Sequence, residues 1–369
     1  MTAESAEVVI VGGGAMGASV AYHLTEYGIT DVVLLERDEL ASGSTSKSAG
    51  GFRTQFADEL NIEIALRSIA EFETFEDRLG IDIGFRQVGY LFLLDSQSDL
   101  NRFREALALH HAHGVPSKEL TVADALARVP QLADDGLLAA TFCPLDGYAT
   151  PESVVQGYVR AAADRGARIR QGEPVTAVRC RGDAIIAVDT PRGSIATSTV
   201  VCAAGAWSRD VAATAGVELP VYGQPRWLHY SPESGGLRDN IPLTIDFSTG
   251  FYFHREGPGL VFGGREATLE DLAVPASHRL PVVETLPIQS SWWGFYEMSP
   301  DHNAIVGEAG TPRRFLYGTG FSGHGFQQSP AVGEYLAQLV AGVEPTLDLS
   351  PFALERFEIG TLRTERFVV

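Results

Sequence analysis

The sequence predicts an α/β fold in which a lobe built on a βαβ unit is interleaved with a lobe built on an antiparallel sheet. Three observations indicate this fold. A glycine-rich turn follows an apolar run near the N-terminus, an apolar run returns near residue 200, and residues 220–264 are rich in β-branched and aromatic side chains interrupted by turn residues. With 369 residues, the chain is long enough for two lobes around one or two sizeable cores.

The first elements of the chain form the predicted βαβ unit. Residues 8–11 are a short, continuous apolar run, as expected of a strand buried on both faces. A glycine turn follows at once, then a helix over residues 18–24 that ends near Gly28, and then a second apolar strand over residues 31–36. Strand, glycine turn, helix and strand within about 30 residues make up a βαβ unit.

The remaining elements follow in chain order. Residues 42–51 are small and polar and predict a loop, whereas residues 60–79 place apolar side chains at helical spacing. The other expected elements are a strand over 88–94, helices over 100–111, 122–128 and 151–165, a strand over 196–204, and a last helix over 329–340. No repeat or linker-like tract separates the lobes. We therefore assign residues 1–85, 145–215 and 300–369 to the first lobe, and residues 86–144 and 216–299 to the second.

Charge and composition argue against several classes of protein. The chain has 47 acidic and 28 basic residues, and a net charge of −19 is unfavourable for binding nucleic acid or an anionic membrane. No apolar stretch approaches the roughly 18 residues of a membrane span, and the N-terminus lacks the pattern of a signal peptide. Cys143, Cys180 and Cys202 are widely spaced and form no CxxC pair. We therefore expect neither a disulfide framework nor a structural zinc site, and we expect a cytoplasmic protein.

Gly12, Gly14 and Gly17 form a dinucleotide-binding fingerprint between the first strand and the first helix. The first glycine allows the tight turn, the second lets a pyrophosphate approach the backbone, and the third lets the helix pack on the strand. The N-terminus of the helix faces the phosphate charge, and Glu36, at the end of the next strand, can accept hydrogen bonds from a ribose. The alternative is a glycine turn in an α/β protein that binds nothing there.

Two further loops favour FAD over NAD. Residues 42–53 offer hydroxyl groups and small residues that could follow a pyrophosphate and then pass beneath a flat ring; the alternative is a solvated surface loop. Residues 318–329 carry four glycines directly before a helix, and their backbone N–H groups could stabilise negative charge on the N1–O2 edge of a reduced flavin. The alternative for this second segment is a flexible loop.

These segments together resemble the D-amino-acid-oxidase-like flavoproteins. The sequence is most similar to the branch of sarcosine oxidases, dimethylglycine dehydrogenases and proline dehydrogenase β-subunits, and the resemblance covers essentially the whole chain. It rests on residues 12–36, 44–53, 200–207, 296–307 and 320–330, of which Gly-Phe-Ser-Gly-His-Gly-Phe at 320–326 is the most specific. It implies that the first lobe is a discontinuous, Rossmann-type FAD-binding domain and the second an α+β substrate domain.

The resemblance also implies the residues of the site. The residues expected to contact FAD are Gly12, Gly14, Ala15, Met16, Gly17, Glu36, Arg37, Ser44, Thr45, Ser46, Ser48, Ala49, Gly50, Gly51, Val175, Ala204, Gly205, Trp207, Gly320, Ser322, Gly323, His324, Gly325, Phe326 and Gln327. Those expected to act on the substrate are Arg53, Tyr252, Tyr296, His324 and Gln327.

The substrate-side residues leave alternatives open. Arg53 falls where sarcosine oxidases place an arginine that pairs with the substrate carboxylate, but it could instead pair with Asp58 or Glu59 and hold its loop. Tyr252 and Tyr296 could line a pocket or fill a core.

Two departures from the family pattern bear on the cofactor. Monomeric sarcosine oxidases tether FAD through a cysteine at the position of Gly294, and none of the three cysteines is near it. The resemblance therefore implies non-covalent FAD. Those oxidases also carry a lysine that activates oxygen, and the matching stretch, 259–263, has none, so fast reaction with oxygen is not implied. A carboxylate-binding lysine of the branch is replaced by Gln327.

The resemblance implies FAD-dependent oxidation of the C–N bond of a secondary or tertiary amino acid, such as an N-methylated glycine. Hydride would leave for flavin N5 and the imine would then hydrolyse. Three alternatives stay open: a flavoenzyme for a primary D-amino acid or a 2-hydroxy acid, a β-type or electron-relay subunit of a larger complex, and a nicotinamide dehydrogenase. We expect a small-molecule amine as partner, with a second subunit or a separate electron acceptor left open. We expect no metal, and we interpret His110, His111 and His113 as solvated residues at the exposed end of a polar helix.

Overall fold

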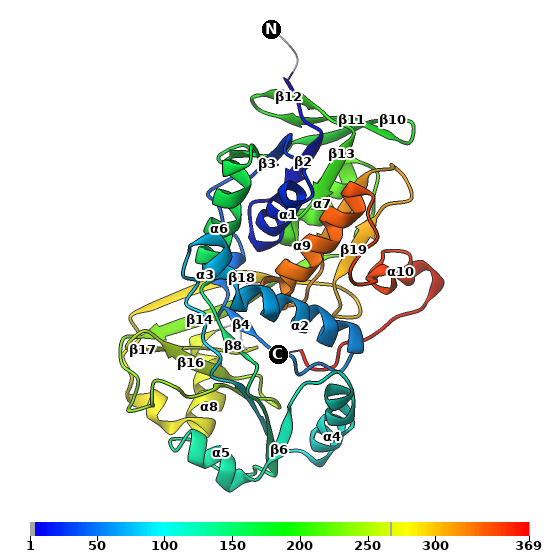
Figure 1. Ribbon diagram of the computed structural model, residues 1–369. Coiled ribbons are helices and arrows are strands. Elements are labelled where there is room, and N and C mark those ends of the chain that lie inside the picture. Colours follow the sequence, from blue (N-terminus) through cyan, green and yellow to red (C-terminus); the bar gives the residue numbers. More distant parts are fainter. Residues whose placement is uncertain (1–3, 266–267, 369) are drawn as a thin grey trace.

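The six-stranded sheet in the upper lobe of Figure 1 carries the predicted βαβ unit. The computed structural model describes residues 4–265 and 268–368. The strands of this sheet, in spatial order, are β19 (Ile305–Glu308), β20 (Phe315–Thr319), β13 (Thr199–Cys202), β2 (Val8–Val11), β3 (Val32–Leu35) and β9 (Arg168–Arg170). All neighbours pair in parallel except β19, which is an antiparallel edge strand.

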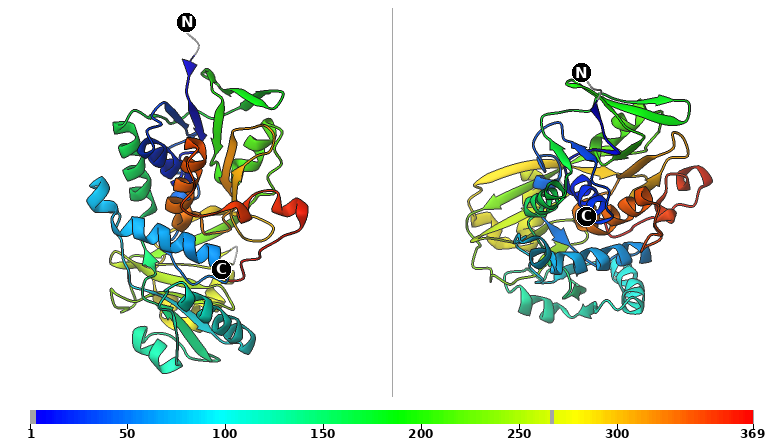
Figure 2. Two further views of the ribbon diagram at one scale, coloured as in Figure 1. Left: turned by 45° about the vertical axis from the view of Figure 1, so that its right-hand side comes forward. Right: turned by 45° about the horizontal axis from the view of Figure 1, so that its top comes forward.

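Both faces of this sheet are covered, which explains its continuous apolar strands. Val8 and Ile10 belong to one core, shared with helices α1 (Ala15–Glu26) and α9 (Gly325–Ala341), which lie side by side in all views (Figures 1 and 2). The alternate residues Val9 and Val11 belong to a second core. That core is closed by α7 (Ser208–Thr214) and by the sheet of β1 (Glu4–Ser5), β12 (Gly193–Ala196), β11 (Ala184–Thr190) and β10 (Ala177–Arg181). The expected Rossmann-type arrangement is confirmed.

An eight-stranded sheet forms the second lobe. Its strands, in spatial order, are β18 (Ser290–Met298), β14 (Tyr222–Ser231), β17 (Gly259–Gly263), β16 (Tyr252–Glu256), β15 (Leu243–Asp246), β5 (Tyr90–Leu94), β7 (Ala139–Cys143) and β6 (Lys118–Leu120). The pairing is antiparallel as expected, except between β5 and β15, where the two segments that build the sheet meet in parallel. One face packs against α5 (Val122–Arg128) and α8 (Leu269–Arg279). The other face is turned toward the first lobe.

Two helices differ most from their predicted bounds. The helix expected over 60–79 is divided into α2 (Glu59–Glu73) and α3 (Phe75–Leu79). The last helix begins at Gly325, four residues earlier than expected, and therefore contains Pro330. Proline has no N–H to give to the carbonyl four residues before it. Here the Ser329 hydroxyl donates to that carbonyl, on Phe326, at 2.8 Å, which satisfies the acceptor and lets the helix start inside the glycine-rich segment.

The remaining helices flank the two sheets. They are α4 (Gln97–Ala112), α6 (Pro151–Asp164) and α10 (Arg356–Ile359), and a two-stranded sheet of β4 (Gly51–Phe52) and β8 (Gly147–Tyr148) lies between the lobes. After α10 the chain returns along α2 and α4 (Figure 1). There Arg363 pairs with Asp58 at 2.7 Å, and the ring of Phe367 stacks on Phe103 with centroids 4.0 Å apart.

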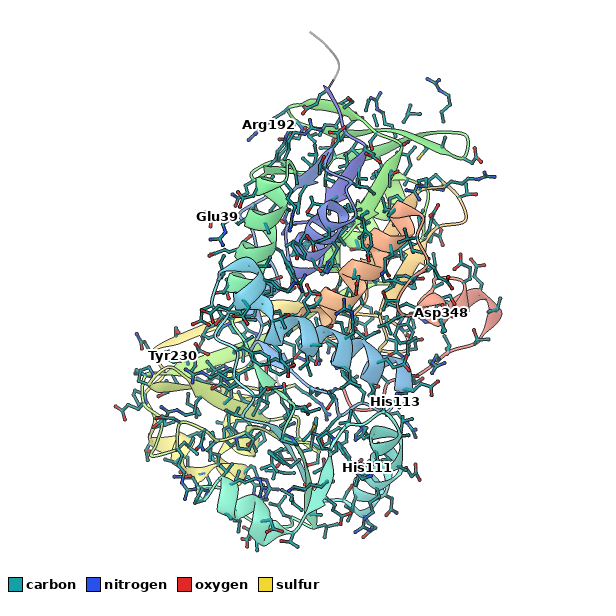
Figure 3. The ribbon with its side chains drawn as sticks, viewed as in Figure 1. Glu39, His111, His113, Arg192, Tyr230 and Asp348 are labelled. Atoms are coloured by element: carbon teal, nitrogen blue, oxygen red, sulfur yellow. The ribbon has the colours of Figure 1, made fainter. Side chains whose placement is uncertain are left out.

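The histidines of α4 differ in part from the expectation. His110 is fully buried and its Nε2 lies 2.9 Å from the Phe56 carbonyl, so the prediction that it is solvated was wrong. His110 lies on the same face of α4 as the buried apolar residues Phe103 and Ala106, so it is buried with them. His111 and His113 lie near the outer edge of the molecule (Figure 3). Within residues 4–265 and 268–368, no three potential metal ligands gather into one group.

All three cysteines are free thiols. In the part of the chain that the structure describes, no helix combines the length and the apolar character that a membrane crossing requires.

Candidate active site

A cavity of about 810 Å³ runs between the two lobes, from the first turn of α1 to the inner face of the eight-stranded sheet. It brings together most of the predicted site residues, although they come from distant parts of the chain. Those that line it are Gly12, Gly14, Ala15, Met16, Glu36, Arg37, Ser44, Thr45, Ser48, Ala49, Gly51, Arg53, Val175, Ala204, Gly205, Trp207, Tyr252, Tyr296, Ser322, Gly323, His324, Gly325, Phe326 and Gln327.

Four predicted residues lie behind the cavity wall. They are Gly17, Ser46, Gly50 and Gly320, and none of them lines the cavity. A Cβ on Gly17 would lie 1.9 Å from the carbonyl oxygen of Gly12, so its task is close packing of helix on strand. Gly50 and Gly320 have φ values of 68° and 70°, which glycine adopts readily. They shape the loops whose neighbours form the wall.

The fingerprint glycines leave a cradle at the N-terminus of α1. Gly12 has a φ of 110°, and a Cβ there would lie 2.3 Å from the carbonyl oxygen of Ala203. Gly14 differs, because the nearest atom to its Cβ position is the Thr45 hydroxyl oxygen at 3.0 Å, and its backbone is extended with a φ of −80°. A side chain on Gly14 would therefore point into the cavity. This open space beside a helix N-terminus fits a pyrophosphate.

Glu36 is held firmly at the same end of the cavity. One carboxylate oxygen accepts a hydrogen bond from the backbone N–H of Gly13 at 2.7 Å, and the other accepts from the N–H of Asp38 at 2.9 Å. The next residue, Arg37, lies with its guanidinium carbon 3.8 Å from the ring centre of Trp207. Because both amides orient the Glu36 carboxylate, its remaining lone pairs are available to ribose hydroxyls.

Residues 42–53, the serine-rich loop, do not form a solvated surface loop, because they lie between α1 and the edge strand β18. The Ser44 hydroxyl donates to the carbonyl oxygen of Phe295 at 2.7 Å, and the backbone N–H of Ala15 donates to the Thr45 hydroxyl oxygen at 3.1 Å. A short 3-10 turn, Thr45–Lys47, gives the loop its bend. These contacts join the first lobe to the eight-stranded sheet of the second lobe.

Arg53 is buried in the cavity wall, and no carboxylate of the described residues forms an ion pair with it. Its side chain is only 3% exposed, and its guanidinium donates to the carbonyl oxygens of Gln55 and Phe367. Asp58 and Glu59, the alternative partners that the sequence offered, pair with Arg363 instead. Burial lowers the pKa of Arg53, yet an arginine stays charged in proteins. The carboxylates of Glu365 and Asp146 counter this effect of burial through space, but neither forms an ion pair with Arg53 in the described residues. A buried cation whose hydrogen bonds all run to neutral groups is suited to an anionic ligand.

His324 and Gln327 hold Arg53 in place. His324 Nε2 lies 3.1 Å from a terminal nitrogen of Arg53, and the Gln327 side-chain carbonyl accepts from the backbone N–H of Arg53 at 2.6 Å. Burial, with the charge of Arg53 as the next cause, depresses the pKa of His324 well below its usual range. His324 is therefore neutral at physiological pH, and its Nε2 accepts the hydrogen bond from Arg53.

Three tyrosines of the eight-stranded sheet line the same cavity as Arg53. Tyr90, Tyr252 and Tyr296 all line the cavity, on strands β5, β16 and β18. Burial raises the pKa of each, and the side chains of Tyr252 and Tyr296 hydrogen-bond to each other. Tyr90 places its hydroxyl 2.0 Å from where a Cβ on Gly51 would lie, so residue 51 has to be glycine. The hydroxyls remain protonated. One O–H of the Tyr252–Tyr296 pair is donated within the pair, so the other hydroxyl of the pair is the one free to donate into the cavity.

Comparison with known proteins decides the family. Residues 7–339 match the family described as DAO, FAD dependent oxidoreductase. The chain belongs to this family. The cofactor of the family is FAD, and the cradle at Gly14, the oriented Glu36 and the glycine-rich segment before α9 fit that cofactor.

Relatives of this FAD-dependent oxidoreductase include dehydrogenases of amino acids. Mitochondrial sarcosine dehydrogenase of Mus musculus is 30% identical over 382 residues, which cover 96% of this chain and 41% of that protein. FAD-dependent oxidoreductase domain-containing protein 1 of Xenopus laevis is 33% identical over 429 residues, covering 99% and 85%. The solved structure of L-proline dehydrogenase from P. horikoshii is 29% identical and superposes with a TM-score of 0.92, covering 98% of this chain and 100% of that one.

These findings confirm the resemblance inferred from the motifs. The chain spans about two fifths of the length of the sarcosine dehydrogenase that it matches.

Sequence patterns missed several residues of the oxidoreductase's cavity. Lys47, Tyr90, Arg226 and Glu297 all line it. Lys47 is part of the serine-rich loop and could have been included with it. Arg226 and Tyr90 carry no motif, and only the strand register turns them inward. Glu297 directly follows Tyr296, and its burial depends on the glycines that surround it.

Glu297 is a buried carboxyl group among glycines. Thr319 donates its hydroxyl to one Glu297 oxygen at 2.8 Å, and the backbone N–H of Gly320 donates to the same oxygen at 3.3 Å. The other oxygen lies 3.4 Å from where a Cβ on Gly325 would stand. Burial outweighs these hydrogen bonds and raises the pKa of Glu297 to about 7.

We expect this carboxyl to make the stability of the FAD-free protein depend on pH. Its pKa is higher in the folded protein than the ordinary value of 4.5, so the folded state binds the proton more tightly. The free energy of unfolding should therefore fall as the pH rises from about 4.5 to about 7. The glutamine of Glu297→Gln does not titrate. The free energy of unfolding of this variant should therefore rise relative to that of the wild type over this window, by up to about 3 kcal/mol. Urea unfolding of both proteins at pH 5 and pH 8 tests this prediction. If the free energies of unfolding of variant and wild type differ by the same amount at both pH values, the prediction is wrong.

A second prediction concerns the attachment of FAD. The resemblance found in the sequence predicts that Gly294 falls where monomeric sarcosine oxidases have their tethering cysteine, and a Cβ at Gly294 would lie 2.5 Å from Cβ of Lys47. With neither a thiol nor room for one, FAD should be held without a covalent bond. Precipitating the purified protein with acid should leave the yellow colour in the supernatant. Flavin that stays with the washed, denatured pellet would show that a tether exists.

Proposed function

We propose that this FAD-dependent oxidoreductase oxidises the C–N bond of a secondary or tertiary amino acid. The observation that carries the proposal is Arg53, a buried guanidinium in the wall of the FAD cavity that forms no ion pair with any carboxylate in the part of the chain that the structure describes. A guanidinium binds a carboxylate through two parallel hydrogen bonds, and this pairing fixes the orientation of the ligand as well as its position. The relatives named for sarcosine and proline dehydrogenation act on amino acids of this kind, which supports the choice of substrate.

The residues of the chain divide the work of the reaction. FAD, when bound, supplies the two-electron acceptor for a hydride from the carbon next to the substrate nitrogen. Arg53 binds the substrate carboxylate, while the hydrogen-bonded pair of Tyr252 and Tyr296 lines the same cavity and offers it a hydroxyl group. Loss of hydride from the free secondary amine leaves a protonated imine, which keeps the N–H proton, so no base has to remove it. Water then hydrolyses the imine to an amine and an aldehyde or keto acid.

His324 and Gln327 act as positioning residues in this proposal. The neutral His324 accepts a hydrogen bond from the guanidinium of Arg53, and Gln327 accepts from its backbone. A base is not required, because a substrate that binds as the free amine already has the lone pair that assists departure of the hydride. In the glycine-rich segment at the N-terminus of α9, the N–H groups of Ser322 and His324 are donated to the carbonyl oxygens of Glu297 and Phe321. The segment can therefore offer the backbone N–H groups of Gly323 and Gly325 to the cavity.

A substrate panel with an artificial dye as electron acceptor tests the proposal. N-methylglycine, N,N-dimethylglycine and proline should reduce the dye, whereas dimethylamine should not, because it has no carboxylate. A D-amino acid or a 2-hydroxy acid as the best substrate would overturn the proposal in favour of the alternatives left open by the sequence. Activity of the purified chain alone would show that no second subunit is required. We further propose a reducing, cytoplasmic setting, in keeping with three free cysteines.

A further inference from the structure

Arg226 is a second guanidinium at the same cavity. It lies on β14, whose outer part carries Tyr230 at the left of the molecule (Figure 3). The buried Nε of Arg226 has no hydrogen-bond partner. A terminal nitrogen of the guanidinium donates to the carbonyl oxygen of the preceding residue, Pro225, at 3.1 Å. Within residues 4–265 and 268–368 no carboxylate forms an ion pair with it. Because the buried Nε lacks an acceptor, an anion that accepts a hydrogen bond from it would be stabilised at this position.

Arg226 and Arg53 flank one tyrosine. The guanidinium carbon of Arg226 lies 5.2 Å from the ring centre of Tyr296. The charges of Arg226 and of Arg53 both lower the pKa of Tyr296, against the larger effect of burial. The strip of cavity wall beside them is apolar and consists of Leu228, Leu243 and Ile245. The two guanidinium groups therefore face a shared space from separate positions on its wall.

A third cationic residue lies at the Arg226 end. In the register of β14 with β18, Arg226 pairs with Gly294, and the side chain of Lys47 packs against that glycine. Lys47 has no carboxylate partner in the described residues either. This gathering of positive charge is local, since the chain as a whole carries a net charge of −19. A negative ligand group at this end would be attracted there and repelled by most of the surface.

We propose that the substrate of this site is a dicarboxylic secondary amine, whose first carboxylate binds Arg53 and whose second carboxylate, on the other nitrogen substituent, binds Arg226. The inference rests on the proposed function and narrows its substrate class. An N-methylated glycine would fill the Arg53 end and leave Arg226 without an anion. A second carboxylate would supply the missing acceptor and could bind Arg226 through two hydrogen bonds. An apolar chain between the two carboxylates would contact Leu228 and Ile245.

Binding of unreactive thioethers to the FAD-loaded protein tests this inference. The probes are 3-(carboxymethylthio)propanoate and its monoamide at the propanoate end. The two molecules are nearly equal in size and differ by one negative charge. Sulfur replaces nitrogen, so there is no C–N bond to oxidise, and calorimetry reports affinity. The wild type should bind the diacid about ten- to a hundredfold more tightly than the monoamide, the expected gain for a hydrogen-bonded charged group.

Variants assign this preference to Arg226. In Arg226→Gln the affinity ratio of diacid to monoamide should fall to about one, and Arg226→Lys should give an intermediate ratio. Arg209→Gln, which removes the same charge from an exposed position on α7 outside the cavity, should keep the wild-type ratio. FAD content confirms that each variant is folded. The wild-type ratio needs no variant, so the inference stays testable if Arg226→Gln does not fold.

The outcomes separate this inference from the proposed function. Equal binding of the two probes by the wild type, or an unchanged ratio in Arg226→Gln, would overturn the second carboxylate site. If the monoamide still binds, and binds more weakly in Arg53→Lys, the proposed function stands without it. If neither probe binds the wild type, both fail, because Arg53 then holds no carboxylate.

Discussion

Gly14→Val should produce a folded protein that no longer retains FAD. The backbone of Gly14 is extended, with a φ of −80°, a conformation open to any residue, and its Cβ position meets only the rotatable Thr45 side chain. The added methyl groups would therefore occupy the cavity at the N-terminus of α1, where a pyrophosphate has to approach the backbone. An overlap of this kind costs about 3 kcal/mol, or about a hundredfold or more in the Kd of FAD. Flavin content after gel filtration, with FAD titration of the apoprotein, measures the effect.

Gly12→Val is the matched comparison for this experiment. Gly12 has a φ of 110°, and its Cβ would collide with the carbonyl of Ala203, so this variant should lose stability rather than FAD affinity alone. Circular dichroism should show a native Gly14→Val protein and a destabilised Gly12→Val protein. If Gly14→Val is purified yellow with a normal flavin content, the cradle at α1 does not hold the cofactor.

Arg53→Lys should weaken the use of carboxylated amines while FAD stays bound. Lysine keeps the positive charge but cannot make two parallel hydrogen bonds to a carboxylate, and it cannot reproduce the contacts of Arg53 with Gln55, His324 and Phe367. Loss of a hydrogen bond to a charged group costs roughly 1.5–3 kcal/mol, so kcat/KM should fall about ten- to a hundredfold, mostly through KM. Steady-state kinetics with N-methylglycine and a dye acceptor provide the measurement.

Arg67→Lys serves as the control for Arg53→Lys. Arg67 makes a two-point pair with Glu334 outside the cavity, so its replacement changes an arginine of similar geometry but should not affect KM. Amines that lack a carboxylate should be poor substrates of the wild type and should lose little in Arg53→Lys. Unchanged kinetics for carboxylated amines in this variant would rule out Arg53 as the anchor and leave Gln327 or Arg226 to be tested.

The elements of the FAD lobe could be predicted from the sequence because their signals are local. The apolar run at residues 8–11, the three spaced glycines and the carboxylate of Glu36 lie within 30 residues, and each has a direct backbone reason. The parallel pairing of β5 with β15 could not be predicted in this way. It joins residues about 150 positions apart, and no local pattern reports such a register.

Site residues that belong to a glycine-rich motif could be predicted from the sequence. Site residues whose orientation is set by strand register could not. Arg53 was found through its place after the glycine pair, but only the structure shows that Asp58 pairs with Arg363 and not with Arg53. Arg226 sits in an ordinary β-pattern, and its inward orientation follows from its pairing with Gly294. His110 shows the opposite error, because a polar helix end suggested exposure while the packing of α4 buries it.

The central claim is that this chain uses bound FAD to oxidise an amine that carries a carboxylate. Anaerobic mixing of the purified, FAD-loaded protein with N-methylglycine, N,N-dimethylglycine, proline and a dicarboxylic secondary amine, recorded by absorption spectroscopy, tests it most directly. At least one of these amines should bleach the oxidised flavin band to completion and yield one imine, aldehyde or keto acid per flavin, and dimethylamine should leave the band unchanged. A spectrum that stays fully oxidised with every carboxylated amine, while a 2-hydroxy acid or a primary D-amino acid bleaches it, would contradict the claim.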